Sequence, residues 1–262
     1  MKKASNLIIN GLRAVMLASF IFTMVRGLIS LTGGAMDSSH YFSAAASSMI
    51  GFLLTLIPVF LVRKNILAIP PIIQTLYSVF VFCAMFGGDV LNFYNTVSWW
   101  DSFLHLTSGA LFSAIGYLVF VSINRNADVR NQLHPVTAIM FAVCFALAAG
   151  VVWEIYEFAA DCLFGMNMQR WQNTMSVEQW ASLQHVSNFS QPGLIDSMKD
   201  MILDTMGAIF SIPILLPMIR RGNRYVKTTI STQQVQAATW TPIPSAAADS
   251  LDLEDETLEK AA

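Results

Sequence analysis

The chain has 262 residues, of which 55% are apolar and 12% charged. Fifteen basic and 17 acidic side chains cannot cover the surface of a soluble protein of this length, which excludes a water-soluble fold. The long apolar stretches instead predict an all-α, polytopic membrane protein embedded in a lipid bilayer. No basic, aromatic pattern indicates a nucleic-acid partner.

Six stretches are each long enough to cross about 30 Å of hydrocarbon, which takes about 20 helical residues. In chain order we predict transmembrane helices at Leu7–Leu31, Phe42–Val62, Ile66–Phe86, Phe103–Ile123, Val136–Phe158 and Met201–Ile219. No small-residue cleavage site follows the first stretch, so we interpret it as an uncleaved span rather than a signal peptide.

Basic residues in the connections predict the orientation. Alternate connections, beginning with the N-terminus, hold Lys2, Lys3, Arg13, Arg63, Lys64, Arg125, Arg130, Arg220, Arg221, Arg224 and Lys227. The connections on the opposite side hold only Arg170 and Lys199. By the positive-inside rule, both termini are therefore expected in the cytoplasm.

The domain organisation follows from the same map. We predict a six-helix transmembrane domain over residues 1–221, with an outer loop over about 162–198. Residues 222–262 are rich in Ser, Thr, Ala and Gln and then in acids, which predicts a disordered cytoplasmic tail. No segment outside the membrane has the length of a typical independent domain. Any chemistry must therefore be built from the membrane helices and their loops.

Acidic residues gather at one end of the last three predicted spans, whereas the opposite halves contain none. Each set has helical spacing, so its members share one helix face. The sets are Asp101 and His105; Glu154, Glu157 and Asp161; and Asp196, Asp200 and Asp204. The deeper acids cannot face lipid without a cost of several kcal/mol each. We therefore expect them to face one another, a wet cavity, a cation or a basic partner.

Simpler explanations exist for some of these residues. Helix capping alone can account for Asp101 and Asp196, and Asp161 can be a solvated loop acid. Arg26 and Lys199 can each form an ion pair with one acid, which still leaves the acids in excess.

Several carboxylates with one imidazole make an oxygen-rich site, which suits Mg²⁺, Mn²⁺ or Ca²⁺ better than Zn²⁺. His105 is either a satisfied interior histidine or a general base beside the cation. Without a metal ion, neighbouring carboxylates would share protons, as a proton relay requires. The tentative metal ligands are Asp101, His105, Glu154, Glu157, Asp196 and Asp200, with Asp161 and Asp204 carrying less weight.

Three motifs carry a family resemblance. They are W-D-S-F-L-H-L-T-S-G at Trp100–Gly109, W-E-I-Y-E-F-A-A-D at Trp153–Asp161 and G-L-I-D-S-M-K-D at Gly193–Asp200. The region from Phe86 to Arg221 resembles the YjdF-like family of uncharacterised bacterial inner-membrane proteins. The resemblance implies a multi-pass protein of the bacterial cytoplasmic (inner) membrane. It points to the same six tentative ligands, whereas Asp204 and the long tail depart from the pattern.

Three functions are compatible with this cluster. The first is a divalent-cation-dependent membrane enzyme acting on a lipid or lipid-linked substrate, with His105 as its base. The second is a cation- or proton-coupled transporter that uses the same acids. The third is a scaffold whose acids hold a structural cation.

Overall fold

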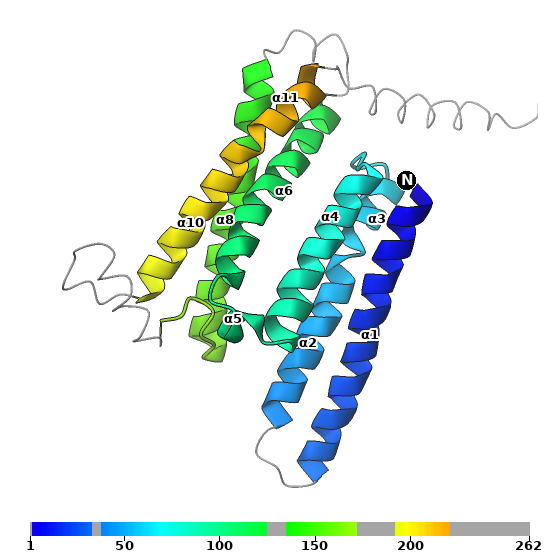
Figure 1. The fold of residues 1–262 in the computed structure, drawn as a ribbon, viewed down its shortest axis with the longest axis vertical. Helices are drawn as coiled ribbons and strands as arrows, with labels where there is room; N and C mark the ends of the chain where they lie inside the picture. The colour runs from blue at the N-terminus through cyan, green and yellow to red at the C-terminus, as the bar shows by residue number, and fades with distance from the viewer. Residues whose placement is uncertain (1, 33–37, 125–134, 172–191, 221–262) are drawn as a thin grey trace, which may run out of the picture. The chain divides into compact units, whose positions relative to one another are not determined.

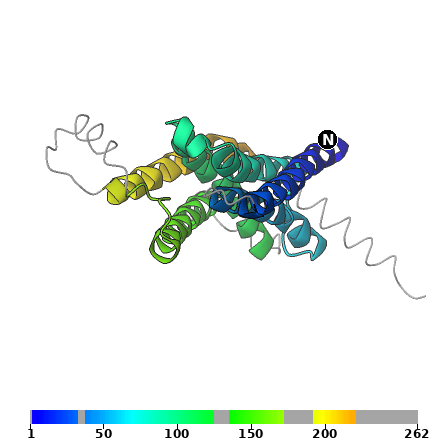
Figure 2. The same cartoon turned by 90° about the horizontal axis from the view of Figure 1, so that it is seen from below.

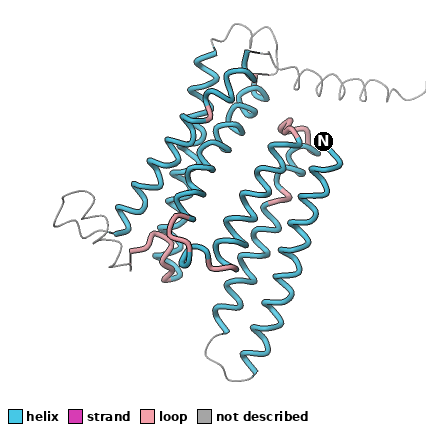
Figure 3. Tube along the Cα trace, in the orientation of Figure 1, coloured by secondary structure: helices cyan, strands magenta, loops and turns pink. Residues whose placement is uncertain are grey.

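The computed structural model describes residues 2–32, 38–124, 135–171 and 192–220, and this part of the chain contains helices, turns and loops but no strand (Figure 3). The predicted tail and most of the predicted outer loop lie outside these residues. The helices are α1 (Lys2–Thr32), α2 (Ser38–Leu54), α3 (Ile57–Arg63), α4 (Pro71–Val81), the π-helix η1 (Phe82–Val90), α5 (Phe93–Thr96), α6 (Trp100–Ile123), α8 (Pro135–Phe164), α10 (Pro192–Phe210) and α11 (Ile212–Arg220).

These helices form six segments that are long and apolar enough to cross a membrane, which confirms the predicted helical, polytopic class. Three segments are a single helix (α1, α6 and α8), and the other three are two helices in line, as in α2 with α3. The third segment begins at Pro71 rather than Ile66, because Pro70 and Pro71 fix the helix start. The sixth begins at Pro192, nine residues before the predicted Met201. Its polar first turns lower the hydropathy but are paired inside the protein, so the helix extends through them.

Two groups of helices make up the described part of the chain. One contains α1, α2, α4 and η1, and the other contains α6, α8, α10 and α11, while α4 and α6 touch across the two groups (Figures 1 and 2). The start of α6, the end of α8 and the start of α10 lie at the same end of the second group (Figure 1). This arrangement brings the polar ends of three helices together.

Small residues allow α6, α8 and α10 to approach closely near Asp204. A Cβ atom added to Gly109 of α6 would collide with the backbone of Asp204 in α10. A Cβ atom added to Gly150 of α8 would lie 2.5 Å from Oδ2 of the same aspartate. In lipid, helices associate through such close packing rather than through the hydrophobic effect. The glycines therefore set Asp204 deep between its two neighbours.

Candidate functional site

The acids and the histidine at the ends of α6, α8 and α10 are all buried. Asp200 and Asp204 are the most enclosed, with 1% and 2% of their surfaces exposed. The other members are at most 8% exposed: Asp101, His105, Glu154, Glu157, Asp161 and Asp196. The predicted acidic and histidine cluster therefore exists, and its side chains point away from lipid.

His105 lies between three of these acids. Its Nδ1 is 3.2 Å from Oδ2 of Asp204. Its Nε2 is 3.7 Å from Oδ1 of Asp101 and 3.8 Å from Oδ2 of Asp200. If Nδ1 carries the proton and donates it to Asp204, the lone pair of Nε2 faces the gap between the two other carboxylates. Such a carboxylate–histidine pair is the usual support of a metal-binding imidazole.

Asp204 was given less weight in the sequence analysis, yet it makes the shortest contact with the imidazole. Its other oxygen, Oδ1, makes a short hydrogen bond with the hydroxyl of Ser108. That hydroxyl also lies 2.8 Å from the backbone carbonyl of His105, to which it can donate instead. Both oxygens of Asp204 are thus held by neighbouring residues on one face of α6, in a position that fixes the orientation of His105.

Two basic side chains neutralise the outer acids. Arg170 lies 3.4 Å from Oδ2 of Asp101 and 3.8 Å from Oδ1 of Asp196. Lys199 reaches Asp101, Asp196 and Asp200 at 3.9, 3.6 and 3.5 Å. The sequence predicts Lys199 as a counter-ion but not Arg170, because a position in a loop has no helical spacing to relate it to the acids.

The other expected counter-ion, Arg26, pairs with no acid among the described residues. Its guanidinium lies over the Tyr41 ring, 5.6 Å from the centroid, and 3.4 Å from the Tyr41 hydroxyl. The prediction that Arg26 offsets one acid is wrong, because α1 belongs to the other helix group.

The two glutamates of α8 differ in their partners. Glu157 accepts a 2.7 Å hydrogen bond from the indole of Trp153, one turn earlier in α8. Glu154 is close enough to Ser197 and His105 for their charges and dipoles to act on it. However, neither of its buried carboxylate oxygens has a hydrogen-bond partner of ordinary geometry in the described part of the chain. Burying an acid without a hydrogen-bond partner costs free energy, so Glu154 indicates that the site accommodates a further group such as a ligand or a cation.

Asp161 has a different role from the other acids. Its Oδ1 accepts a 2.7 Å hydrogen bond from the backbone N–H of Met168, and its Oδ2 accepts a 3.0 Å bond from that of Gln169. These two bonds fold the segment after α8 back over the helix end. Because Arg170 follows directly, Asp161 positions the loop that delivers Arg170.

Tyr94 was not anticipated as part of this region. Its ring lies against Gly88, where a Cβ atom would collide with it. Burial raises the pKa of Tyr94, and the charges of Asp89, Asp101 and Glu157 raise it further. The hydroxyl therefore lies near the cluster, on the side of η1. No motif or spacing relates Tyr94 to the acids, since it lies in the connection between two spans.

Three donor atoms meet the geometric requirement for a cation. The chosen atoms of Asp101, His105 and Asp200 all lie within 4.8 Å of one another. Ligands of Mg²⁺ can be up to about 4.2 Å apart and ligands of Ca²⁺ up to about 5 Å, given the usual metal–oxygen distances. The separations of 3.7 and 3.8 Å from Nε2 are compatible with either ion.

A comparison with protein families identifies the chain. Residues 11–221 match the model of the family described as "Predicted membrane protein (DUF2238)". The chain belongs to this family. The resemblance to a family of uncharacterised membrane proteins is thereby confirmed, and the matched residues include all eight members of the cluster.

An uncharacterized protein of Thermotoga maritima is similar to this DUF2238 protein. The two are 27% identical over 139 residues, which make up 53% of this chain and 59% of the relative. The chain thus spans about three fifths of the length of that relative. No solved structure matches the chain.

Proposed function

We propose that this protein is a divalent-cation-dependent membrane enzyme, a hydrolase or transferase, that acts on a lipid or lipid-linked substrate. The reaction centre would be the group around His105, at the common end of α6, α8 and α10. The observation that carries the proposal is the orientation of the imidazole, with Nδ1 facing Asp204 and Nε2 facing two carboxylates. Glu154, whose oxygens have no hydrogen-bond partner of ordinary geometry among the described residues, supports it independently.

Each residue then has a distinct task. Asp101, Asp200 and Nε2 of His105 bind the cation, and Asp204 holds the imidazole in the required tautomer. A nitrogen that coordinates a cation cannot also accept a proton, so His105 is a ligand here rather than the general base. Glu154 would be the base that takes the proton of the attacking water molecule or hydroxyl, which a bound cation would make more acidic.

The transporter alternative has less support. A transporter needs a polar route from the cluster to the other end of the helices. Among the described residues, no charged side chain is buried beyond Asp204 in that direction. The buried positions there carry no charge and are mostly small or apolar, such as Leu111, Ala142 and Ala208, although Ser113, Tyr117 and Ser211 bear hydroxyls. This packing favours a reaction at one end over passage across the membrane.

Metal content tests the first half of the proposal. The full-length protein in lipid nanodiscs is equilibrated with Mn²⁺, Mg²⁺ or Ca²⁺ and then analysed for bound metal beside the Asp200→Asn and Asp161→Asn variants. We expect about one bound ion in the parent protein and in Asp161→Asn, and a loss in Asp200→Asn. Parent protein that holds no ion at neutral pH would overturn the proposal.

Activity tests the second half. Vesicle-borne phospholipids and lipid phosphates are incubated with the metal-loaded protein, and release of phosphate, headgroup or acyl chain is measured. We expect cation-dependent turnover that is lost in Glu154→Gln while metal content is retained. Bound metal without turnover of any lipid would support the structural-cation alternative instead.

A further inference from the structure

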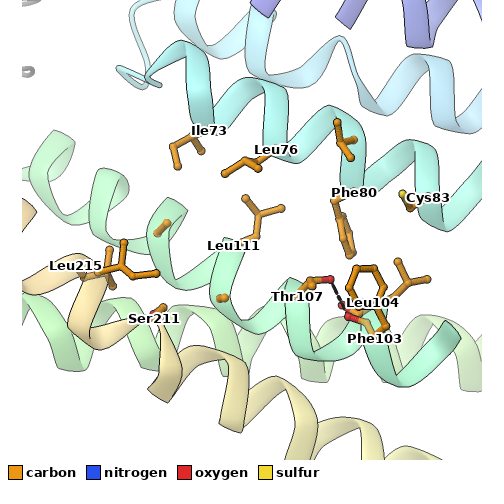
Figure 4. A pocket seen from close by; sticks show the side chains of 14 residues that line it. Ile73, Leu76, Phe80, Cys83, Phe103, Leu104, Thr107, Leu111, Ser211 and Leu215 are labelled. Atoms are coloured by element: carbon orange, nitrogen blue, oxygen red, sulfur yellow. Dashed lines mark hydrogen bonds between the residues drawn. The ribbon is translucent and has the colours of Figure 1, made fainter. Parts of the chain in front are cut away.

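An apolar groove of about 380 Å³ lies between the two helix groups, away from the acidic cluster. Figure 4 shows Ile73, Leu76 and Phe80 of α4 along one wall and Leu111 of α6 facing them. One end is formed by Ser211 and Leu215, and the other by Cys83 and Phe103 (Figure 4). The groove lies on the face of α6 that points away from His105.

The groove offers no hydrogen bond to an occupant. Its two hydroxyl-bearing side chains are satisfied within their own helices. Thr107 donates to the carbonyl of Phe103 at 2.8 Å or of Leu104 at 3.0 Å, and Ser211 donates to that of Ala208 at 2.7 Å. A polar ligand would lose its hydration here without compensation, so the occupant must be apolar.

The groove is open to the surroundings of the helices. Leu76, Phe103 and Ile214, which all line it, are 49%, 42% and 70% exposed. Since the helices cross a bilayer, these side chains face hydrocarbon rather than water. A groove left empty would forfeit van der Waals contacts on both walls, and the molecules beside it are lipids.

The dimensions limit what can enter. From Phe103 to Ala114 the groove follows α6 for eleven residues, or about 16 Å. A single unbranched hydrocarbon chain can extend over this length, whereas a transmembrane helix of a second copy, which takes about 20 residues and about 30 Å, would run well beyond it. The length is about half of the 30 Å hydrocarbon thickness, which is the depth of one leaflet.

We propose that this groove is a binding site for one acyl chain of a membrane lipid, which fills the space between α4 and α6. The site does not depend on the cation or on the proposed reaction, because it lies on another face of α6. A bound chain would connect the two helix groups by contacts that their own side chains do not make.

Photolabelling tests this site. The full-length protein is reconstituted in vesicles of phosphatidylethanolamine and phosphatidylglycerol that contain a phosphatidylethanolamine with a diazirine on one acyl chain. Labelled residues are mapped by peptide mass spectrometry at increasing probe fractions. We expect labelling at Phe80, Cys83 and Leu104 to saturate. Labelling of Phe22 in α1, which is 63% exposed, should rise in proportion to the probe.

Substitutions that fill the groove provide the control. Ala110→Phe and Ala114→Phe each put a ring into it and should abolish the saturable labelling, whereas Ala148→Phe, at an exposed position of α8, should leave it unchanged. Linear labelling of the groove in the parent protein would show bulk lipid contact only and overturn the proposal. If the groove stays unlabelled and dimers linked by a Cys83 disulfide form, the proposal is overturned, and a second copy of the protein covers the groove.

Discussion

Nδ1 of His105 lies 3.2 Å from Oδ2 of Asp204, a residue 99 positions later in the chain. The contact joins α6 to α10 inside the membrane region, and both side chains are almost fully buried. Because one nitrogen of the ring is engaged in this way, the other is directed at Asp101 and Asp200.

The first prediction concerns this contact. Asp204→Asn keeps the size of the side chain but removes the negative charge that favours a proton on Nδ1 of His105. We expect affinity for Mn²⁺ to fall by about 10- to 100-fold, as for other supports of metal-binding histidines. Electron paramagnetic resonance of free Mn²⁺ measures the affinity. Asp89→Asn in η1, which leaves His105 untouched, is the control and should bind normally. Equal Mn²⁺ affinities in the parent, Asp204→Asn and Asp89→Asn would show that Asp204 does not contribute to cation binding.

Lys199 is expected to compete with the cation. Its ammonium lies 3.5 Å from Asp200 and 3.9 Å from Asp101, two of the proposed ligands. Lys199→Met keeps the apolar length and removes the charge, so cation affinity should rise by about tenfold, or about 1.4 kcal/mol. Isothermal titration with Mn²⁺ measures this, beside Lys64→Met at an exposed position. A fall in affinity would mean that Lys199 organises the site rather than competes for it.

Glu154 should destabilise the protein until a cation binds. Among the described residues neither of its buried oxygens has a hydrogen-bond partner of ordinary geometry, so Glu154→Gln removes a poorly compensated buried charge. We expect the metal-free variant to melt at a higher temperature than the metal-free parent. Added Mn²⁺ should then raise the melting temperature of the parent more than that of the variant. Identical increases in melting temperature of parent and variant on adding Mn²⁺ would show that Glu154 does not interact with the cation.

Asp161 is expected to matter for stability and not for metal binding. Asp161→Ala leaves the backbone N–H groups of Met168 and Gln169 without their acceptor, at a cost of about 1 to 3 kcal/mol. Proteolysis of the segment after α8 should become faster, while the number of bound ions stays the same. Loss of the ion together with an intact loop would make Asp161 a ligand.

The glycine contacts give a prediction about packing. Gly109→Ala forces α10 away from α6, because the new Cβ atom meets the Asp204 backbone, and should cost about 1 to 3 kcal/mol. Gly11→Ala is the matched control, since a Cβ atom there meets nothing within 4 Å. It should leave stability unchanged or raise it by up to about 1 kcal/mol. Thermal unfolding in detergent compares the two, and similar midpoints would contradict this account of the packing.

Much of the fold could be predicted because the bilayer imposes simple rules. Length and apolarity identify a span, and helical spacing relates Asp101 to His105 and Asp200 to Asp204. The start of α10 was missed because hydropathy treats Asp196 and Lys199 as exposed charges, whereas they pair with each other at 3.6 Å. The predicted orientation of the termini stays a prediction.

The remaining parts of the site depend on contacts between distant segments. Arg170 reaches Asp101 because Asp161 anchors the preceding loop, a relationship that no periodicity encodes. Tyr94 approaches the cluster because Gly88 leaves space for its ring. Spacing along one helix could show which acids share a face, but not which basic or aromatic side chain meets them.

The position of Arg170 and Lys199 has a consequence for exchange with the surroundings. In the described part of the chain no charged side chain is buried beyond Asp204, and the two basic side chains that contact the acids, Arg170 and Lys199, lie at the outer end of the cluster. A cation that enters or leaves from that end passes two positive charges. We therefore expect the salt concentration on that side of the membrane to affect how fast a cation enters or leaves.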